Sequence, residues 1–207
     1  MADTRSVSLD DVKKLRDMTG AGMMDCRKAL EETEGDIDGA VRLLRERGIA
    51  KAAKRVGRET SNGVVEAYLH RTSEDYPPQV GARVELNCES AFVAKGSDFR
   101  SLARELCLHI AAAAPRWVTR EDVPADLIEQ ERAVHRARAE QEGKPAHIID
   151  RIVDNQIETF YKDSVLLDQA FVRDPSVKIS ELIAQTGARV AENIVVRRFS
   201  RFSIKEA

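Results

Sequence analysis

The chain has 207 residues, of which 43% are hydrophobic and 33% are charged. This balance is typical of a folded globular protein and differs from the polar composition of disordered chains. Lysine and arginine number 33 against 35 aspartate and glutamate residues, which leaves a net charge of -2. Because a nearly neutral chain has no overall field to attract polyanions, neither nucleic acid nor a membrane surface is the expected partner.

The start of the chain, residues 1–12, is polar and charged where a secretory signal needs a continuous apolar stretch. No run approaches the roughly 18 apolar residues of a membrane helix, so we expect a cytoplasmic protein without a membrane partner. The cysteines, Cys26, Cys88 and Cys107, are odd in number and widely spaced. This pattern favours reduced, buried thiols over a disulfide framework.

Residues 1–50 are predicted to form a module of three short helices. Ser8 is typical of a helix start, and apolar residues follow it at helical spacing: Leu9, Val12, Leu15 and Met18. Two glycines within residues 20–22 favour a turn after this helix. The second helix is expected over residues 23–33, and the third over residues 36–48, where Gly48 ends it.

Residues 51–62 are expected to form a basic helical connector. Its cations are Lys51, Lys54, Arg55 and Arg58. Two interpretations remain open for them: a solvated helix face, which is the commoner use of such a charge run, or a surface that meets phosphate or an acidic protein.

Residues 63–207 are predicted to form an α+β core domain. Strand-like alternation occurs over residues 64–71, 80–89 and 194–202, with a proline-containing loop over 72–79. Helical periodicity covers residue 97 to Pro115, the charged stretch 116–163 that Gly143-Lys144-Pro145 divides, and residues 177–190. Residues 166–172 are expected to be an extended crossing segment. The predicted fold is a small antiparallel sheet with helices on one side.

The sequence contains no recognisable catalytic, metal or nucleotide motif. The histidines, His70, His109, His135 and His147, are scattered and match no metal-binding spacing. No glycine-rich phosphate loop is present, so we expect no directly bound nucleotide and no cofactor. Cys107 and His109 lie two residues apart on a predicted helix, where their side chains point away from each other. These observations predict a protein that acts by binding another protein, not an enzyme.

Two segments have more than one interpretation. Phe92 lies where a strand gives way to a helix, and the usual packing of isolated aromatic residues favours the core over a protruding anchor. The turn Thr19-Gly20-Ala21-Gly22-Met23-Met24 either lets two helices approach closely or presents a methionine-lined surface to a partner.

Three segments carry a resemblance to a known family. They are LRDMTGAGMMDCRKAL at residues 15–30, VELNCESAFVA at 84–94 and ENIVVRRF at 192–199. All three closely resemble segments of bacterial elongation factor Ts, and they occur in the same order over nearly the whole chain. The chain is therefore identified as a member of that family.

The resemblance implies a guanine nucleotide exchange factor for elongation factor Tu, which binds the GDP-loaded GTPase and lets GTP replace GDP. It implies that the three-helix module is similar to a ubiquitin-associated domain. This module would contact the nucleotide domain of the partner through Thr19, Gly20, Ala21, Gly22, Met23 and Met24. The length resembles the short form of the family, with a single core subdomain and no inserted coiled coil. In that form residues 63–207 are the dimerisation domain of a homodimer.

The family pattern at the strand-to-helix junction is Thr-Asp-Phe-Val, which corresponds here to Ser90, Ala91, Phe92 and Val93. The resemblance implies that these residues take part in dislocating Mg²⁺ from the partner, with Phe92 inserted between two partner helices and Val93 supporting it. Ser90 is a mild departure from the pattern, but Ala91 lacks the acidic group. We therefore expect a weaker, still functional exchanger. The alternatives are an inactive paralogue that binds elongation factor Tu without exchange, or an RNA- or ribosome-binding module.

Overall fold

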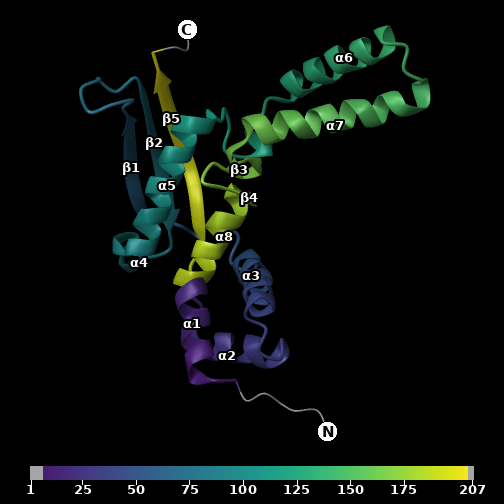
Figure 1. The fold of residues 1–207 in the computed structure, drawn as a ribbon. Helices are drawn as coiled ribbons and strands as arrows, with labels where there is room; N and C mark the ends of the chain where they lie inside the picture. Colours follow the sequence, from purple (N-terminus) through teal and green to yellow (C-terminus); the bar gives the residue numbers. More distant parts are fainter. Residues whose placement is uncertain (1–6, 205–207) are drawn as a thin grey trace.

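The computed structural model describes residues 7–204, apart from the side chain of Ile49. The polar segment 1–6, part of the argument against a secretory signal, lies outside this range. Helices α1 (Leu9–Thr19), α2 (Met23–Glu32) and α3 (Ile37–Ala53) form the predicted N-terminal module (Figure 1). They surround a core of their own, made of Val12, Leu15, Cys26, Ala29, Leu30, Ala40 and Leu44.

The third helix is longer than predicted. It continues through Gly48 to Ala53, so the expected end at Gly48 is wrong. A Cβ atom at Gly48 would lie 3.4 Å from Cβ of Ala188 on a neighbouring helix, and this close approach accounts for a glycine inside α3. Only residues 51–53 of the proposed connector are helical. The division of the chain into 1–50, 51–62 and 63–207 stays a prediction.

The remaining chain is built on a three-stranded antiparallel sheet, which confirms the predicted α+β fold. Strands β1 (Asn62–His70), β2 (Val80–Cys88) and β5 (Ile194–Ser203) pair in the order β1-β2-β5. Alternation places Ala82, Val84, Leu86 and Cys88 of the central strand on one face, where they are buried. Helices α5 (Ser97–Ala113) and α8 (Ile179–Val190) cover this face (Figure 1).

The main core lies between the sheet and these two helices. Its fully buried members include Val84, Leu86, Phe99, Leu106, Ile110 and Ile179. Cys88 and Cys107 lie in this core and Cys26 in the N-terminal one; all three are buried and form no disulfide, as predicted. The predicted stop of the long helix is also confirmed, because Ala114 adopts a left-handed conformation (φ 49°) just before Pro115.

Helices α6 (Ala125–Gln141) and α7 (Ala146–Ser164) form an antiparallel arm that projects from the body (Figure 1). The predicted division near Gly143 is confirmed, with a positive φ of 70° at that residue. The projection of these two helices as a paired arm was not predicted, and the expectation that the chain lacks an inserted coiled coil stays a prediction. Apolar side chains from the two helices bury one another, so the arm has a small core of its own: Ala139, Ile149, Val153 and Ile157.

The segment that follows the arm is not extended as predicted. Residues Leu166–Asp168 form a short 3-10 helix, η2, in which the amides of Asp168 and Gln169 donate to the carbonyls three residues before them. The amides of Leu166 and Leu167 donate to the carbonyls of Trp117 and Val118, which fixes this helix against that segment. Strand β3 (Ala170–Phe171) then pairs with β4 (Asp174–Lys178), which was not predicted. Since β4 occupies residues 174–178, helix α8 begins at Ile179 and not at Val177.

Candidate partner-binding site

Phe92 is the most exposed large hydrophobic residue among residues 7–204. Its side chain is 87% accessible, so the interpretation favouring a core position is wrong. It lies in the first turn of α4 (Ala91–Lys95), a five-residue helix directly after β2. An aromatic ring held in water at this junction costs free energy that burial against a partner would recover.

The residues on either side of Phe92 are fixed to the body of the domain. Ser90 is the N-cap of α4, and its hydroxyl accepts a hydrogen bond from the amide of Val93 at 3.3 Å. Val93 itself is buried in the main core. Ala91 is exposed beside Phe92 and carries no polar side-chain atom. The junction therefore presents an apolar ring on a supported base, without a carboxylate next to it.

A carboxylate from the far end of the chain holds this junction. Glu192 Oε2 accepts hydrogen bonds from the amides of Glu89 and Ser90, both at 3.0 Å, and its Oε1 accepts from the Ser90 hydroxyl. In return, Glu89 Oε1 accepts from the amide of Asn193 at 2.6 Å. Sequence reasoning assigned no role to Glu89 or Glu192. Their only signal was membership of two separate segments that resemble the family.

Cys88 lies directly beneath the junction. Burial raises the pKa of its thiol, and the neighbouring Glu192 carboxylate raises it further. The protonated Sγ donates to the carbonyl of Ser90 at 3.3 Å. The thiol thus serves as a small apolar support with one hydrogen bond and is not activated as a nucleophile.

The turn over residues 19–24 is the second predicted surface. Gly20 ends α1 in a left-handed conformation (φ 66°), and the Thr19 hydroxyl donates to the carbonyl of Leu15 at 2.7 Å and accepts from the amide of Ala21 at 3.3 Å. Gly22 then serves as the N-cap of α2, which begins at Met23. Met23 is half-buried against the module core, whereas Met24 is exposed. Gly20 therefore allows the tight turn and Met24 faces solvent, while contact of this turn with a partner stays a prediction.

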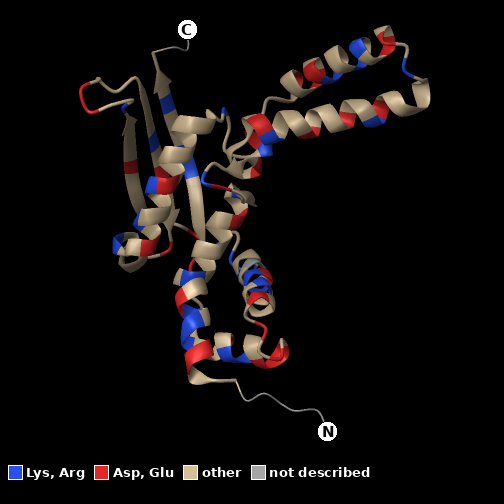
Figure 2. Ribbon diagram, in the orientation of Figure 1, with Lys and Arg blue, Asp and Glu red and all other residues tan. Residues whose placement is uncertain are grey.

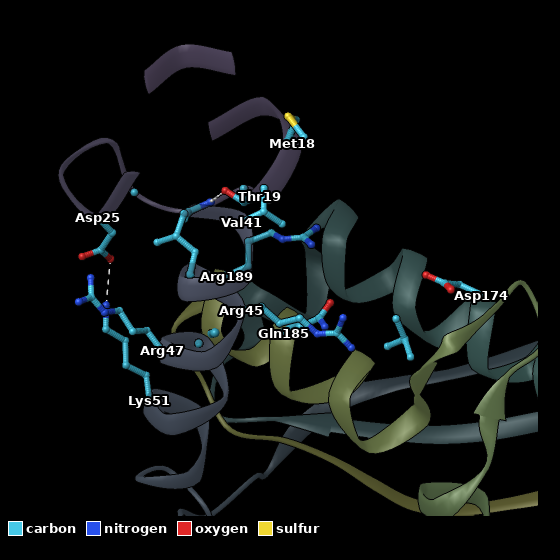
Figure 3. Close-up of a pocket in the computed structure, with 17 residues that line it drawn as sticks. Met18, Thr19, Asp25, Val41, Arg45, Arg47, Lys51, Asp174, Gln185 and Arg189 are labelled. Carbon is cyan, nitrogen blue, oxygen red and sulfur yellow. Dashed lines mark hydrogen bonds and ion pairs between the residues drawn. The ribbon is translucent and has the colours of Figure 1, made fainter. Parts of the chain in front are cut away.

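Arg189 of α8 lies between the two surfaces. A Cβ atom at Gly20 would come within 2.8 Å of its Nε, and its guanidinium lies 3.8 Å from the carboxylate of Asp98, in the first turn of α5. A cavity of about 340 Å³ opens beside it, between the turn and α8 (Figure 3). Its walls include Thr19 and Gly22 from the module and Gln185 from α8.

Carboxylates lie beside two of the four cations of the predicted connector. Of the four cations proposed for a phosphate surface, Lys51 pairs with Asp25 at 2.9 Å and Arg58 lies 3.5 Å from Glu89. Acidic and basic residues alternate along the N-terminal helices and the arm (Figure 2). This distribution favours the solvated-face interpretation, because phosphate binding needs cations that are gathered and unpaired.

Within residues 7–204, no group of histidine, cysteine, aspartate and glutamate side chains is arranged to hold a metal ion. In the same part of the chain, no helix is long and apolar enough to span a membrane.

Comparison with known proteins identifies the family. The family model described as elongation factor TS matches residues 9–206. An elongation factor Ts from Herpetosiphon aurantiacus is 51% identical over 96% of this chain and 98% of its own length. The elongation factor Ts from Fervidobacterium nodosum is 47% identical over 97% of this chain and 99% of its own length. The one from Frankia alni is 49% identical over the full length of both chains, 100% of each. The chain belongs to the elongation factor Ts family.

Proposed function

We propose that this chain is the guanine nucleotide exchange factor for elongation factor Tu during translation elongation, acting in the cytoplasm. It binds the GDP-loaded GTPase and promotes release of GDP, so that GTP can load. Exchange makes and breaks no covalent bond, so the protein is not an enzyme and needs no cofactor or nucleotide site of its own. The observation that carries the proposal is the 87% exposed Phe92 on a base fixed at both sides.

In this proposal Phe92 enters the partner near its Mg²⁺ site, and Ser90, Ala91 and Val93 complete the segment that dislocates the ion. Burying one phenylalanine contributes about 1.5 to 3 kcal/mol. Lowering the partner's nucleotide affinity a thousandfold requires about 4 kcal/mol. Phe92 alone is therefore insufficient, and a second contact has to supply the difference.

The second contact is the turn from Thr19 to Met24, which we assign to the nucleotide domain of the partner. Two contacts on one body favour a partner whose nucleotide site is distorted over one that holds GDP tightly. By linkage, nucleotide must weaken the binding of this protein to the partner by the same factor. Exchange is then a cycle in which nucleotide and exchange factor displace each other.

Ala91 reduces the strength of this exchanger without abolishing it. A hydrogen bond from an acidic side chain at position 91 to the partner would contribute about 1.5 to 3 kcal/mol of binding free energy, and Ala91 cannot make it. This loss leaves the contribution of Phe92 intact. Binding to elongation factor Tu without faster GDP release would instead identify an inactive member of the family.

We further propose that the chain forms a homodimer through the uncovered face of the sheet. Helices cover one face, while the other exposes Val65 and Leu69 of β1 and Phe202 of β5. Leu69 and Phe202 both pair with Gly81, so they flank this glycine on the same face of the sheet. An apolar group of this kind on an open sheet fits a second copy that presents the same face.

Release of a fluorescent GDP analogue from elongation factor Tu at fixed Mg²⁺ tests the exchange function. We expect the wild-type protein to accelerate release and Phe92→Ala to lose most of the acceleration. Tyr76→Ala is the matched control, since Tyr76 is also an exposed aromatic residue. It lies in the loop at the opposite end of β2, a strand whose nine residues make eight steps of about 3.3 Å, or roughly 26 Å. Equal loss in both variants would reject the assigned role of Phe92, and no acceleration by the wild type would reject the function.

A further inference from the structure

We propose that Glu192 is a positioning residue for nucleotide exchange, because its carboxylate holds the β2–α4 junction in the conformation that presents Phe92. The inference rests on the proposed function, in which Phe92 enters the partner. Glu192 acts through other residues, since its bonds go to the backbone and hydroxyl of the junction. It is not required to touch the partner itself.

The hydrogen bonds form a continuous path from Glu192 to both sides of Phe92. Glu192 Oε2 fixes the amides of Glu89 and Ser90, both at 3.0 Å. Its Oε1 fixes the orientation of the Ser90 hydroxyl, which in turn accepts from the amide of Val93. Phe92 lies between Ser90 and Val93, so its backbone is held on each side while its ring stays in solvent.

Glu192 is itself held in place by the turn that ends α8. Ala191 adopts a left-handed conformation (φ 61°), and the amide of Glu192 donates to the carbonyl of Gly187 at 3.1 Å. The following residue, Asn193, donates its amide to Glu89 and its side-chain amide to the carbonyl of Arg58 at 3.0 Å. Two carboxylates thus exchange bonds with backbone amides 102 to 104 residues away in the chain.

The short helix needs this external support. Helix α4 has five residues, too few to be stable as an isolated helix. Among them only Val93 is buried, and Phe92 gains almost nothing from packing. Without Glu192, the junction would sample other conformations, and ordering it would oppose binding. A segment that is ordered beforehand avoids that entropic cost.

The test combines Glu192 and Phe92 variants in the GDP-release assay. We expect Glu192→Ala to slow exchange about tenfold at sub-saturating concentration, the size of effect that ordering one flexible interface segment produces. In the Phe92→Ala background the same change is expected to alter the rate by less than about twofold, because both variants remove one coupled unit. Equal slowing in the two backgrounds would show that Glu192 acts elsewhere, and would overturn the inference.

Conservative variants separate positioning from general stability. Glu192→Gln keeps the size and one oxygen acceptor, so it remains folded and shows a smaller loss than Glu192→Ala. Ser90→Ala removes the hydroxyl from this path and is expected to slow exchange, whereas Ser90→Thr retains the hydroxyl and is expected to slow it less. A loss with Ser90→Thr as large as with Ser90→Ala would contradict the hydroxyl path.

Hydrogen–deuterium exchange without elongation factor Tu gives an independent readout. Glu192→Ala is expected to increase exchange of the Ser90 and Val93 amides, while amides in the middle of α5 keep their protection. Unchanged protection at the junction would overturn the inference whatever the GDP-release rates. A second outcome separates the inference from the proposed function. If Glu192→Ala loses protection at the junction but the wild-type protein does not accelerate GDP release from elongation factor Tu, the proposed function is rejected. An exchange role for Glu192 is then rejected as well, although its contact with the junction stands.

Discussion

Replacing Arg120 with alanine is expected to loosen the base of the α6–α7 arm. Arg120 lies in the 3-10 helix η1 (Arg120–Asp122) and binds two carboxylates at once. Its Nε and one terminal nitrogen donate to Asp168 at 2.9 and 2.8 Å, and its two terminal nitrogens donate to Glu158 of α7 at 2.8 and 2.9 Å. The guanidinium also lies 4.6 Å from the ring centre of Tyr161. One side chain thus joins three elements.

The size of the effect follows from the exposure of the two carboxylates. The Asp168 side chain is 18% exposed, so its charged hydrogen bonds contribute about 1.5 to 3 kcal/mol. The Glu158 side chain is 50% exposed, and solvent screening reduces its pair to about 0.5 kcal/mol. We expect Arg120→Ala to lower the free energy of unfolding by about 2 to 3 kcal/mol. For a chain of this length, the loss corresponds to a fall in Tm of about 4 to 12 °C.

Thermal and urea unfolding of Arg120→Ala and of the control Arg132→Ala measure this difference. Arg132 lies on the same arm and pairs with Asp154, which is 62% exposed, so its loss should cost no more than about 0.5 kcal/mol. The hydrogen bonds from Arg120 lower the pKa of Glu158. The stabilisation from the Arg120–Glu158 pair is therefore complete above the usual carboxylate pKa and is lost as the pH falls below it. The difference in free energy of unfolding between the wild type and Arg120→Ala should therefore become smaller at acid pH. Equal stability of the two variants at neutral pH would refute the reasoning.

Three further predictions concern other parts of the molecule. Burial lowers the pKa of His109, and its Nδ1 accepts a hydrogen bond from the amide of Val172 at 3.3 Å. The unfolded chain therefore takes up a proton at this histidine more readily than the folded protein does. The free energy of unfolding should fall as the pH drops below about 6.5, the usual pKa of histidine. Urea unfolding between pH 5 and 8 should show a flatter profile for His109→Gln, and an unchanged profile would contradict this. On the open sheet face, Leu69→Asp should shift the protein toward monomer in sedimentation equilibrium, with Val134→Asp on the arm as the control. Finally, Ala91→Asp should accelerate GDP release by about tenfold or more, because a charged hydrogen bond to the partner contributes about 1.5 kcal/mol or above. An unchanged release rate would show that position 91 makes no such contact.

Periodicity in the sequence correctly predicted the elements whose core faces are regular. The helical spacing of Phe99, Leu102 and Leu106 and the alternation of Val84, Leu86 and Cys88 both appear as buried faces in the structure. Each pattern is local, because neighbours three or four residues apart define a helix face and alternate residues define a strand face. The three family-like segments also sufficed to identify the family, since they cover both ends of the chain.

Phe92 shows where local reasoning stops. The preference of isolated aromatic residues for the core suggested burial, but the structure leaves the ring 87% accessible. What decides its exposure is the neighbouring geometry: Val93 points into the core, and Ser90 caps the helix so that the intervening side chain faces outward. The family resemblance anticipated the anchor, whereas the residue pattern by itself did not.

The sequence by itself determined the helical and strand periods, the apolar cores and the membership of the family. Only the tertiary structure decided how Gly48 fits inside a helix against Ala188, how η2 replaces an extended segment, and how Glu192 reaches Ser90 across 102 residues. Hydrogen bonds and close contacts between distant segments leave no period in the sequence, because they depend on where the chain returns in space. For that reason the position of Phe92 could be predicted as part of a motif, but its support by Glu192 could not.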